Sequence, residues 1–161
     1  EHLIENVRDH KFFPNNVLEI VASKHQGPNA WKLAGDGWKQ MLRDHLKEVL
    51  AKTTGALNTP KTAQVDELFL KTIGYTKISN KWGWPGSTAA NTAKRLDALV
   101  TLRGSIAHRV KSSKSVTKKD VLNAIDLISR LAVKTNNEMH THLDTLCGKA
   151  PWGRVKYKKT S

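Results

Sequence analysis

The stretch that decides the fold is residues 117–147, TKKDVLNAIDLISRLAVKTNNEMHTHLDTLC, because it predicts one long amphipathic helix. Thr117, followed three positions later by Asp120, is typical of a cap at a helix start. Gly148 and Pro151 predict where the helix ends. Apolar residues recur at helical spacing between these limits, at Val121, Ile125, Ile128, Ala132, Met139, Leu143 and Leu146.

The same spacing predicts helices through most of the remaining chain, and no run alternates strictly enough to predict a sheet. Ser87 is the expected cap of the helix before the long one, and Pro14 is expected to interrupt the N-terminal helices. We therefore predict an all-α bundle of about five helices. The further helices cover about residues 37–52, 62–73 and 87–109, with one or two more in the first 26 residues.

The length of 161 residues predicts one helical domain over 1–148 and a basic tail over 149–161. Trp152 and Tyr157 stand among the basic residues of the tail. Two interpretations stay open: the tail follows a nucleic-acid backbone, or it is a solvated end. On the first interpretation Lys156, Lys158 and Lys159 bind RNA.

The charge balance indicates a polyanionic partner, because 27 Lys and Arg residues against 14 Asp and Glu residues give a net charge of +13. Nucleic acid and anionic membrane surfaces both fit such a charge. No apolar run approaches the roughly 18 residues of a membrane span, and no signal peptide is visible. Cys147 is the single cysteine, which excludes an internal disulfide and favours a cytoplasmic location.

Several enzyme classes lose support because their motifs are missing from the sequence. The chain has no glycine-rich phosphate loop, no His-Glu-x-x-His zinc motif and no Gly-x-Ser-x-Gly elbow. We therefore expect no metal and no cofactor. His140 and His142 are two positions apart and do not share a helical face, so we interpret them as surface residues rather than metal ligands. The chain begins at Glu1, which leaves open a preceding domain.

Arg103 is the clearest local anomaly, because 100° steps along 87–109 place it among apolar residues. A guanidinium on a packed face costs several kcal/mol unless it is paired or meets an anion. The alternative is that Arg103 extends to solvent or pairs with Asp97 or Asp126. The apolar residues around it on the helical wheel are Leu96, Leu99, Val100, Ile106 and Ala107.

His108 follows Arg103 by five positions, which places it about 140° away on an ideal helix. The two side chains converge only if the helix loosens near its end or if two copies of the chain face each other. His108 instead aligns with Gly104, where the missing side chain would let another backbone approach. The alternative is an exposed histidine favoured by the dipole at the helix end.

The segment 99–109, LVTLRGSIAHR, resembles the HEPN superfamily signature, an arginine separated by four to six residues from a histidine near a helix end. The stretch from Asn58 to Gly74 and the helix start from Ser115 resemble the RiboL-PSP type of HEPN domain. The resemblance covers about 58–147 well and the first 57 residues loosely. One departure is Gly104, because the residue after the arginine is usually polar in this family.

The resemblance implies a homodimeric helical bundle whose two motifs form one composite site, as in metal-independent endoribonucleases that act as toxins or anti-phage effectors. Arg103 would then bind the scissile phosphate, and His108 would act as general acid or base in attack by the RNA 2′-hydroxyl. Arg109 and Lys111 follow the motif and would bind the flanking RNA backbone. An antitoxin or partner domain fits the same interpretation.

Two other functions stay open from the sequence. Gly104 favours a non-catalytic HEPN-type module that binds RNA or nucleotides. A helical oligomerisation module of a larger protein is also compatible with the pattern. Trp82 and Trp84 either stack on unpaired bases or pack their loop onto the bundle, and Cys147 is expected to be a partly buried small hydrophobe.

Overall fold

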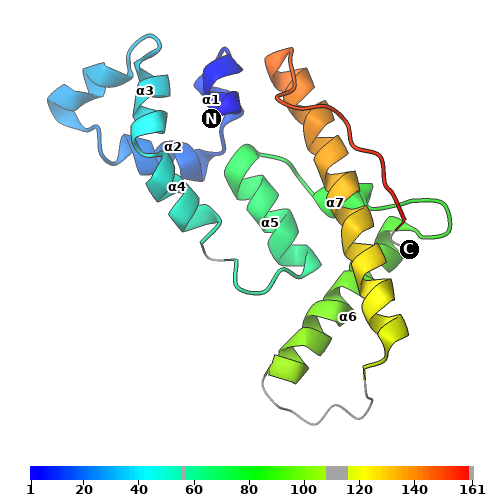
Figure 1. The fold of residues 1–161 in the computed structure, drawn as a ribbon. Helices are drawn as coiled ribbons and strands as arrows, with labels where there is room; N and C mark the ends of the chain where they lie inside the picture. Colours follow the sequence, from blue (N-terminus) through cyan, green and yellow to red (C-terminus); the bar gives the residue numbers. More distant parts are fainter. Residues whose placement is uncertain (56, 108–115, 160–161) are drawn as a thin grey trace.

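The computed structural model describes residues 1–55, 57–107 and 116–159 (Figure 1). In this part of the chain there are seven α-helices, three short 3₁₀ helices and no strand, apart from one isolated bridge between Trp84 and Ser87. The predicted all-α class is therefore confirmed, with more helices than the expected five because several are short.

The N-terminal part is an assembly of four short α-helices and two 3₁₀ helices. Pro14 is the N-cap of α2, a position where its missing N–H breaks no helical hydrogen bond, so the predicted interruption there is confirmed. The elements are α1 (His2–Asn6), η1 (His10–Phe12), α2 (Asn15–Ala22), η2 (Gly27–Leu33), α3 (Gly37–Asp44) and α4 (Leu46–Thr53).

The single helix predicted over 37–52 is wrong, because the chain bends at His45 between α3 and α4. The backbone of His45 has φ −99° and ψ 5°, which takes it out of the helical region. Its ring Nε2 lies 3.3 Å from Nε2 of His25. This long-range contact fixes His45 at the bend, and local helical periodicity carries no sign of it.

The C-terminal part contains the longer helices, α5 (Thr62–Ile73), α6 (Ala89–Ala107) and α7 (Lys118–Cys147), with η3 (Ile78–Lys81) between α5 and α6. The predicted start of α7 is confirmed, because Thr117 and Asp120 form a complete capping box. Its predicted end is confirmed too, since Gly148 caps the helix with φ 69°.

The cap predicted for α6 is one residue too early. Thr88 Oγ1 accepts the backbone N–H of Asn91 at 3.2 Å and caps the helix start. Ser87 instead exchanges backbone hydrogen bonds with Trp84, at 3.0 and 2.9 Å. These bonds hold Ser87 in a turn, which prevents it from entering the helix.

Two hydrophobic cores hold the bundle together, and α7 contributes to both. The N-terminal core joins α1–α4 to the C-terminal end of α7, and the hairpin core joins η3 to α6 and α7. In Figure 1 the short helices gather around the upper end of α7, whereas α6 diverges from its lower end. The buried residues are Leu3, Ile4, Val7, Phe13, Val17, Val21, Leu42, Val49 and Leu143 in the first core, and Ile78, Trp82, Leu96, Val100, Leu127, Leu131 and Met139 in the second.

Candidate active site

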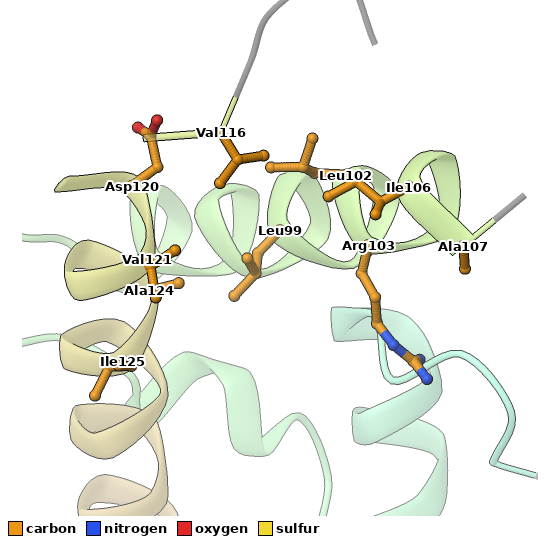
Figure 2. Close-up of a pocket in the computed structure, with 10 residues that line it drawn as sticks. All are labelled: Leu99, Leu102, Arg103, Ile106, Ala107, Val116, Asp120, Val121, Ala124 and Ile125. Atoms are coloured by element: carbon orange, nitrogen blue, oxygen red, sulfur yellow. The ribbon is translucent and has the colours of Figure 1, made fainter. Parts of the chain in front are cut away.

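An open pocket of about 370 Å³ lies where the C-terminal end of α6 diverges from the N-terminal end of α7 (Figure 2). Its wall is almost entirely apolar, with Arg103 and Asp120 as the charged residues among those that line it. The lining residues are Leu99, Leu102, Arg103, Ile106, Ala107, Val116, Asp120, Val121, Ala124 and Ile125.

Several of the apolar side chains around this pocket are exposed. Ile106 is 54% exposed and Val121 is 48% exposed, and Leu122, Ile125 and Ile128 continue the exposed surface along α7. We call this set of five residues, together with Val116, the apolar rim. Exposed apolar side chains that cluster in this way are typical of interaction surfaces. Burying them against a partner would contribute about 25 cal/mol of stabilisation per Å² of apolar area removed from water.

Arg103 is exposed at this pocket rather than enclosed in a packed face. Figure 2 shows its guanidinium extending away from Leu102 and Ile106 instead of lying among them. The expectation that Arg103 sits on a packed face is therefore wrong, because that part of α6 has no covering element among the described residues. The guanidinium stays hydrated and keeps its charge available to an anion.

Neither carboxylate considered as a partner pairs with Arg103. Asp97 Oδ1 accepts the backbone N–H of Thr62 at 2.7 Å, which fastens the start of α5 to α6. Asp126 Oδ2 accepts from Nε of Arg130 at 2.9 Å. No hydrogen bond or ion pair links Arg103 to any residue in the described ranges. Of the two alternatives considered for Arg103, the structure shows the first: the side chain extends into solvent.

Asp120 is committed to the helix cap, although it also lines the pocket. Its Oδ2 accepts from the backbone N–H of Thr117 at 3.0 Å and from the Thr117 hydroxyl at 2.7 Å. A carboxylate held this way stabilises the helix start, where the backbone dipole favours negative charge.

His108, Arg109 and Lys111 lie outside the described residues. The last described residue of α6 is Ala107, so the second half of the motif follows directly after the pocket wall. The roles assigned to these three residues, and the pairing of His108 with Arg103, stay predictions. Gly104 is helical, and a Cβ placed there would meet nothing within 4 Å, so packing within the chain does not require glycine.

Residues 151–159, here called the C-terminal strap, pack along α7 without forming a helix. Asn137 recognises the strap backbone, because its Oδ1 accepts the Val155 N–H at 2.8 Å and its Nδ2 donates to the Val155 carbonyl at 2.8 Å. Arg154 donates from Nη2 to Thr141 Oγ1 at 2.7 Å. Lys156, Lys158 and Lys159 are exposed on this strap.

Arg130 fastens the end of the strap to α7. Its guanidinium lies 4.0 Å from the Tyr157 ring centroid and 5.5 Å from that of Trp84, within range of cation–π attraction. Asp126 accepts a hydrogen bond from the Tyr157 hydroxyl as well as from Arg130. These two partners hold the pKa of Asp126 below its ordinary value, the Tyr157 bond being the larger cause.

Sequence reasoning missed Asn137, Arg130 and Asp126 as anchors of the strap. Asp126 and Arg130 carry a visible signal, since oppositely charged residues four apart on a helix face each other. Asn137 carries none, because its role depends on a segment 18 positions away.

The two tryptophans of the loop have different surroundings. Trp82 is fully buried in the hairpin core and donates from Nε1 to Thr135 Oγ1 at 3.0 Å. Packing is therefore its observed role, and stacking on a base is not available to it. Trp84 is half-buried and contacts Arg130.

His142 is not the surface residue that we expected. It is half-buried, its ring lies 4.9 Å from that of Tyr75 in an edge-on contact, and burial lowers its pKa. Within the described ranges no group of three or more potential ligands is placed to hold a metal ion. Cys147 is half-buried against the N-terminal core, as predicted, and burial raises the pKa of its thiol.

Comparison with known families settles what kind of domain this is. A family model described as RiboL-PSP-HEPN matches residues 2–141. The chain belongs to this family. The match extends the resemblance to the N-terminal helices, which the sequence pattern covered only loosely. No curated protein and no solved structure shows a significant match.

Membership in the HEPN superfamily indicates a function in RNA cleavage or RNA binding and is compatible with dimers. The fold places the open pocket and Arg103 at the free end of the two longest helices of this HEPN domain. Across the part of the chain that the structure describes, no helix has both the length and the apolar character needed to cross a membrane.

Proposed function

We propose that this HEPN domain is a metal-independent endoribonuclease. The observation that carries the proposal is the exposed Arg103 guanidinium, which lines an open pocket and pairs with no carboxylate among the described residues. A guanidinium in this state can donate two parallel hydrogen bonds to phosphate oxygens. His108 follows a few residues later, directly after the pocket wall.

The reaction uses the nucleophile that RNA itself carries. The 2′-hydroxyl attacks the neighbouring phosphorus, the bond from phosphorus to the 5′-oxygen breaks, and a 2′,3′-cyclic phosphate and a 5′-hydroxyl form. His108 accepts the proton of the 2′-hydroxyl or donates one to the leaving 5′-oxygen, since an ordinary histidine pKa near 6.5 suits both tasks. Arg103 stabilises the charge that builds up on the phosphate.

The site is proposed to be complete only in a homodimer. The apolar rim supports this, because its members Ile106, Val121 and Ile125 line the pocket and stay in water in a single copy. Burying the rim against a second copy would bring two motifs together, and it would remove the need for Arg103 and His108 to share a face of one helix. Arg109 and Lys111 would then bind the RNA backbone on either side.

The test is cleavage of a mixed-sequence single-stranded RNA in excess EDTA. We expect wild type to produce cyclic-phosphate ends and to leave DNA of the same sequence uncut, because DNA lacks the 2′-hydroxyl. His108→Ala should reduce the rate by about 10²–10⁴, and Arg103→Ala by about 10²–10³. Arg95→Ala is the matched control, since Arg95 is exposed on the same helix outside the pocket.

A loss of less than tenfold in His108→Ala would remove the proton-transfer role. Equal losses in Arg95→Ala and Arg103→Ala would remove the specific role of the pocket arginine. In cells, expression of the wild-type chain should arrest growth and His108→Ala should not, if the enzyme acts as a toxin or anti-phage effector controlled by an antitoxin.

The second candidate is a non-catalytic HEPN-type module that binds RNA or nucleotides, or that serves oligomerisation in a larger protein. Gly104 favours it, because the position after the arginine holds no polar group and packing in the chain does not require glycine there. RNA binding by a folded dimer without cleavage would support the binding module. Dimer formation without RNA binding would support the oligomerisation module.

A further inference from the structure

The C-terminal strap runs antiparallel to α7, and its direction leads toward the N-terminal end of that helix. Arg154 contacts Thr141, Val155 contacts Asn137, and Tyr157 contacts Asp126, so later strap residues meet earlier residues of α7. The N-terminal end of α7 also lines the pocket that contains Arg103, with Val121, Ala124 and Ile125 on the side of the helix opposite to the strap contacts. The red segment beside α7 in Figure 1 follows this course away from the C-terminal end of the helix.

The spacing of these contacts requires an extended strap. From Thr141 to Asp126 the axis of α7 advances about 22 Å, at roughly 1.5 Å per residue. Three extended strap residues cover only about 10 Å, and the long Arg154 and Tyr157 side chains supply the remainder. The side chains of Arg154 and Tyr157 both contact α7, whereas those of Lys156 and Lys158 are exposed.

The basic groups of this region divide into those that hold the strap and those that stay available. Arg130 is paired with Asp126 and stacked on Tyr157, and Arg154 is bound to Thr141. Neither Lys156 nor Lys158 forms a salt bridge with a described residue. In an extended chain their Cα atoms lie about 7 Å apart, and no salt bridge to a described residue compensates their charges.

We propose that the strap is a preformed track for the backbone of single-stranded RNA, leading it along α7 toward the helix end that borders the motif pocket. Lys156 and Lys158 bind successive phosphates, while Asn137 and Arg130 are positioning residues that keep the strap in place. Like charges spaced along one segment suit a linear polyanion better than a compact acidic surface. The inference rests on the proposed function in taking RNA as the ligand, and it does not require cleavage.

The first test measures how salt weakens binding of a single-stranded oligoribonucleotide, with His108→Ala as background so that the RNA stays intact. Lys156→Gln with Lys158→Gln should reduce the slope of log K against log salt by about 1.4, at roughly 0.7 per phosphate contact on a single strand. Lys32→Gln with Lys47→Gln is the matched control, because both lysines are exposed in the N-terminal part. Equal slopes for the strap pair and wild type would overturn the proposal.

The second test distinguishes a strap that is ordered before RNA binds from a flexible segment that only carries charge. Asn137→Ala keeps every charge but removes both hydrogen bonds to Val155. We expect affinity to fall about three- to tenfold at an unchanged salt slope, because the released strap must be ordered on binding. Unchanged affinity in this variant, with its helix content intact, would contradict the preformed track.

The outcomes also separate this proposal from the function on which it rests. If the strap variant changes the salt slope and wild type cleaves no RNA, the track is supported and the endoribonuclease is contradicted. If cleavage depends on His108 and the strap lysines have no effect on binding, the endoribonuclease is supported and the track is contradicted. Polyglutamate that competes as strongly as RNA of equal charge would identify an acidic protein as the partner and overturn the RNA track.

Discussion

The two halves of α7 carry the same apolar pattern in different surroundings. Toward its middle, Leu127, Leu131 and Met139 are buried in the hairpin core. Toward its start, the α7 members of the apolar rim keep the helical spacing but stay exposed, with Ile125 at 42%. Leu127 and Ile128 show how strongly exposure also depends on the face of the helix, since these neighbours point about 100° apart and are 3% and 46% exposed.

The difference comes from what lies between α6 and α7. Near the middle of α7, η3 packs against both helices, and its Ile78 and the following Trp82 are almost fully buried. At the other end α6 diverges from α7 (Figure 1). Among the described residues, the pocket lies between the two helices there. Apolar periodicity therefore identifies the face of a helix that avoids water without saying what covers it.

The largest expected effect is on stability, and it contrasts the two neighbours directly. Leu127→Ala should lower the free energy of unfolding by about 2–5 kcal/mol, because it removes buried methyl groups and leaves a cavity. Ile128→Ala should change it by less than about 1 kcal/mol, since half of this side chain is already in water. Urea denaturation at low protein concentration measures both changes.

The protein concentration must be low because dimer formation at the rim would stabilise the folded state by mass action. Similar losses for the two variants would show that the rim is covered within a single chain. A large loss for Ile128→Ala that appears only at high concentration would place this residue in the interface.

The sequence predicted the helices best where local signals are complete. The start of α7 depends on Thr117 and Asp120 three positions apart, and α5 ends at Gly74 with φ 71°, a conformation that glycine adopts without strain. The prediction was wrong over 37–52, where the contact between His45 and His25 joins residues far apart in the sequence. Such contacts leave no mark on helical periodicity.

The site was predicted less completely, for a physical reason. The helical wheel correctly placed Arg103 beside apolar residues, but it treated that face as packed. The structure leaves this end of α6 uncovered, so the desolvation argument that singled out Arg103 does not apply. What supports Arg103 instead is the resemblance of its motif and the pocket that it lines.

The next effect concerns association, and it tests whether a second copy covers the rim. Ile125→Asp should weaken the homodimer at least tenfold, because a charge would be buried in an apolar contact. Leu70→Asp is the matched control, since Leu70 is 45% exposed on α5. Sedimentation equilibrium measures both dissociation constants, and cleavage should fall with dimer formation only for Ile125→Asp.

Equal dissociation constants for the two aspartate variants would remove the rim from the interface. A monomeric wild type that still cleaves RNA would remove the composite site as well. Either result would leave the exposed rim as a surface for a different protein.

The smallest expected effect is at Gly104 and asks whether its missing side chain serves the fold or the interface. A Cβ at this position meets nothing within 4 Å, so Gly104→Ala should stabilise α6 by about 0.5–1 kcal/mol. Ala98→Gly is the reverse control, because Ala98 is exposed on the same helix. Thermal unfolding should shift upward for the first variant and downward by a similar amount for the second.

The same pair of variants decides whether Gly104 lies at a contact between two copies. On the helical wheel Gly104 aligns with Asp97 and Thr101 on the polar side of α6, away from the apolar rim. We therefore expect Gly104→Ala to leave the dimer dissociation constant unchanged. A dimer that weakens while the single chain becomes more stable would show that another backbone approaches at Gly104, because only an intermolecular contact would then exclude the added methyl group.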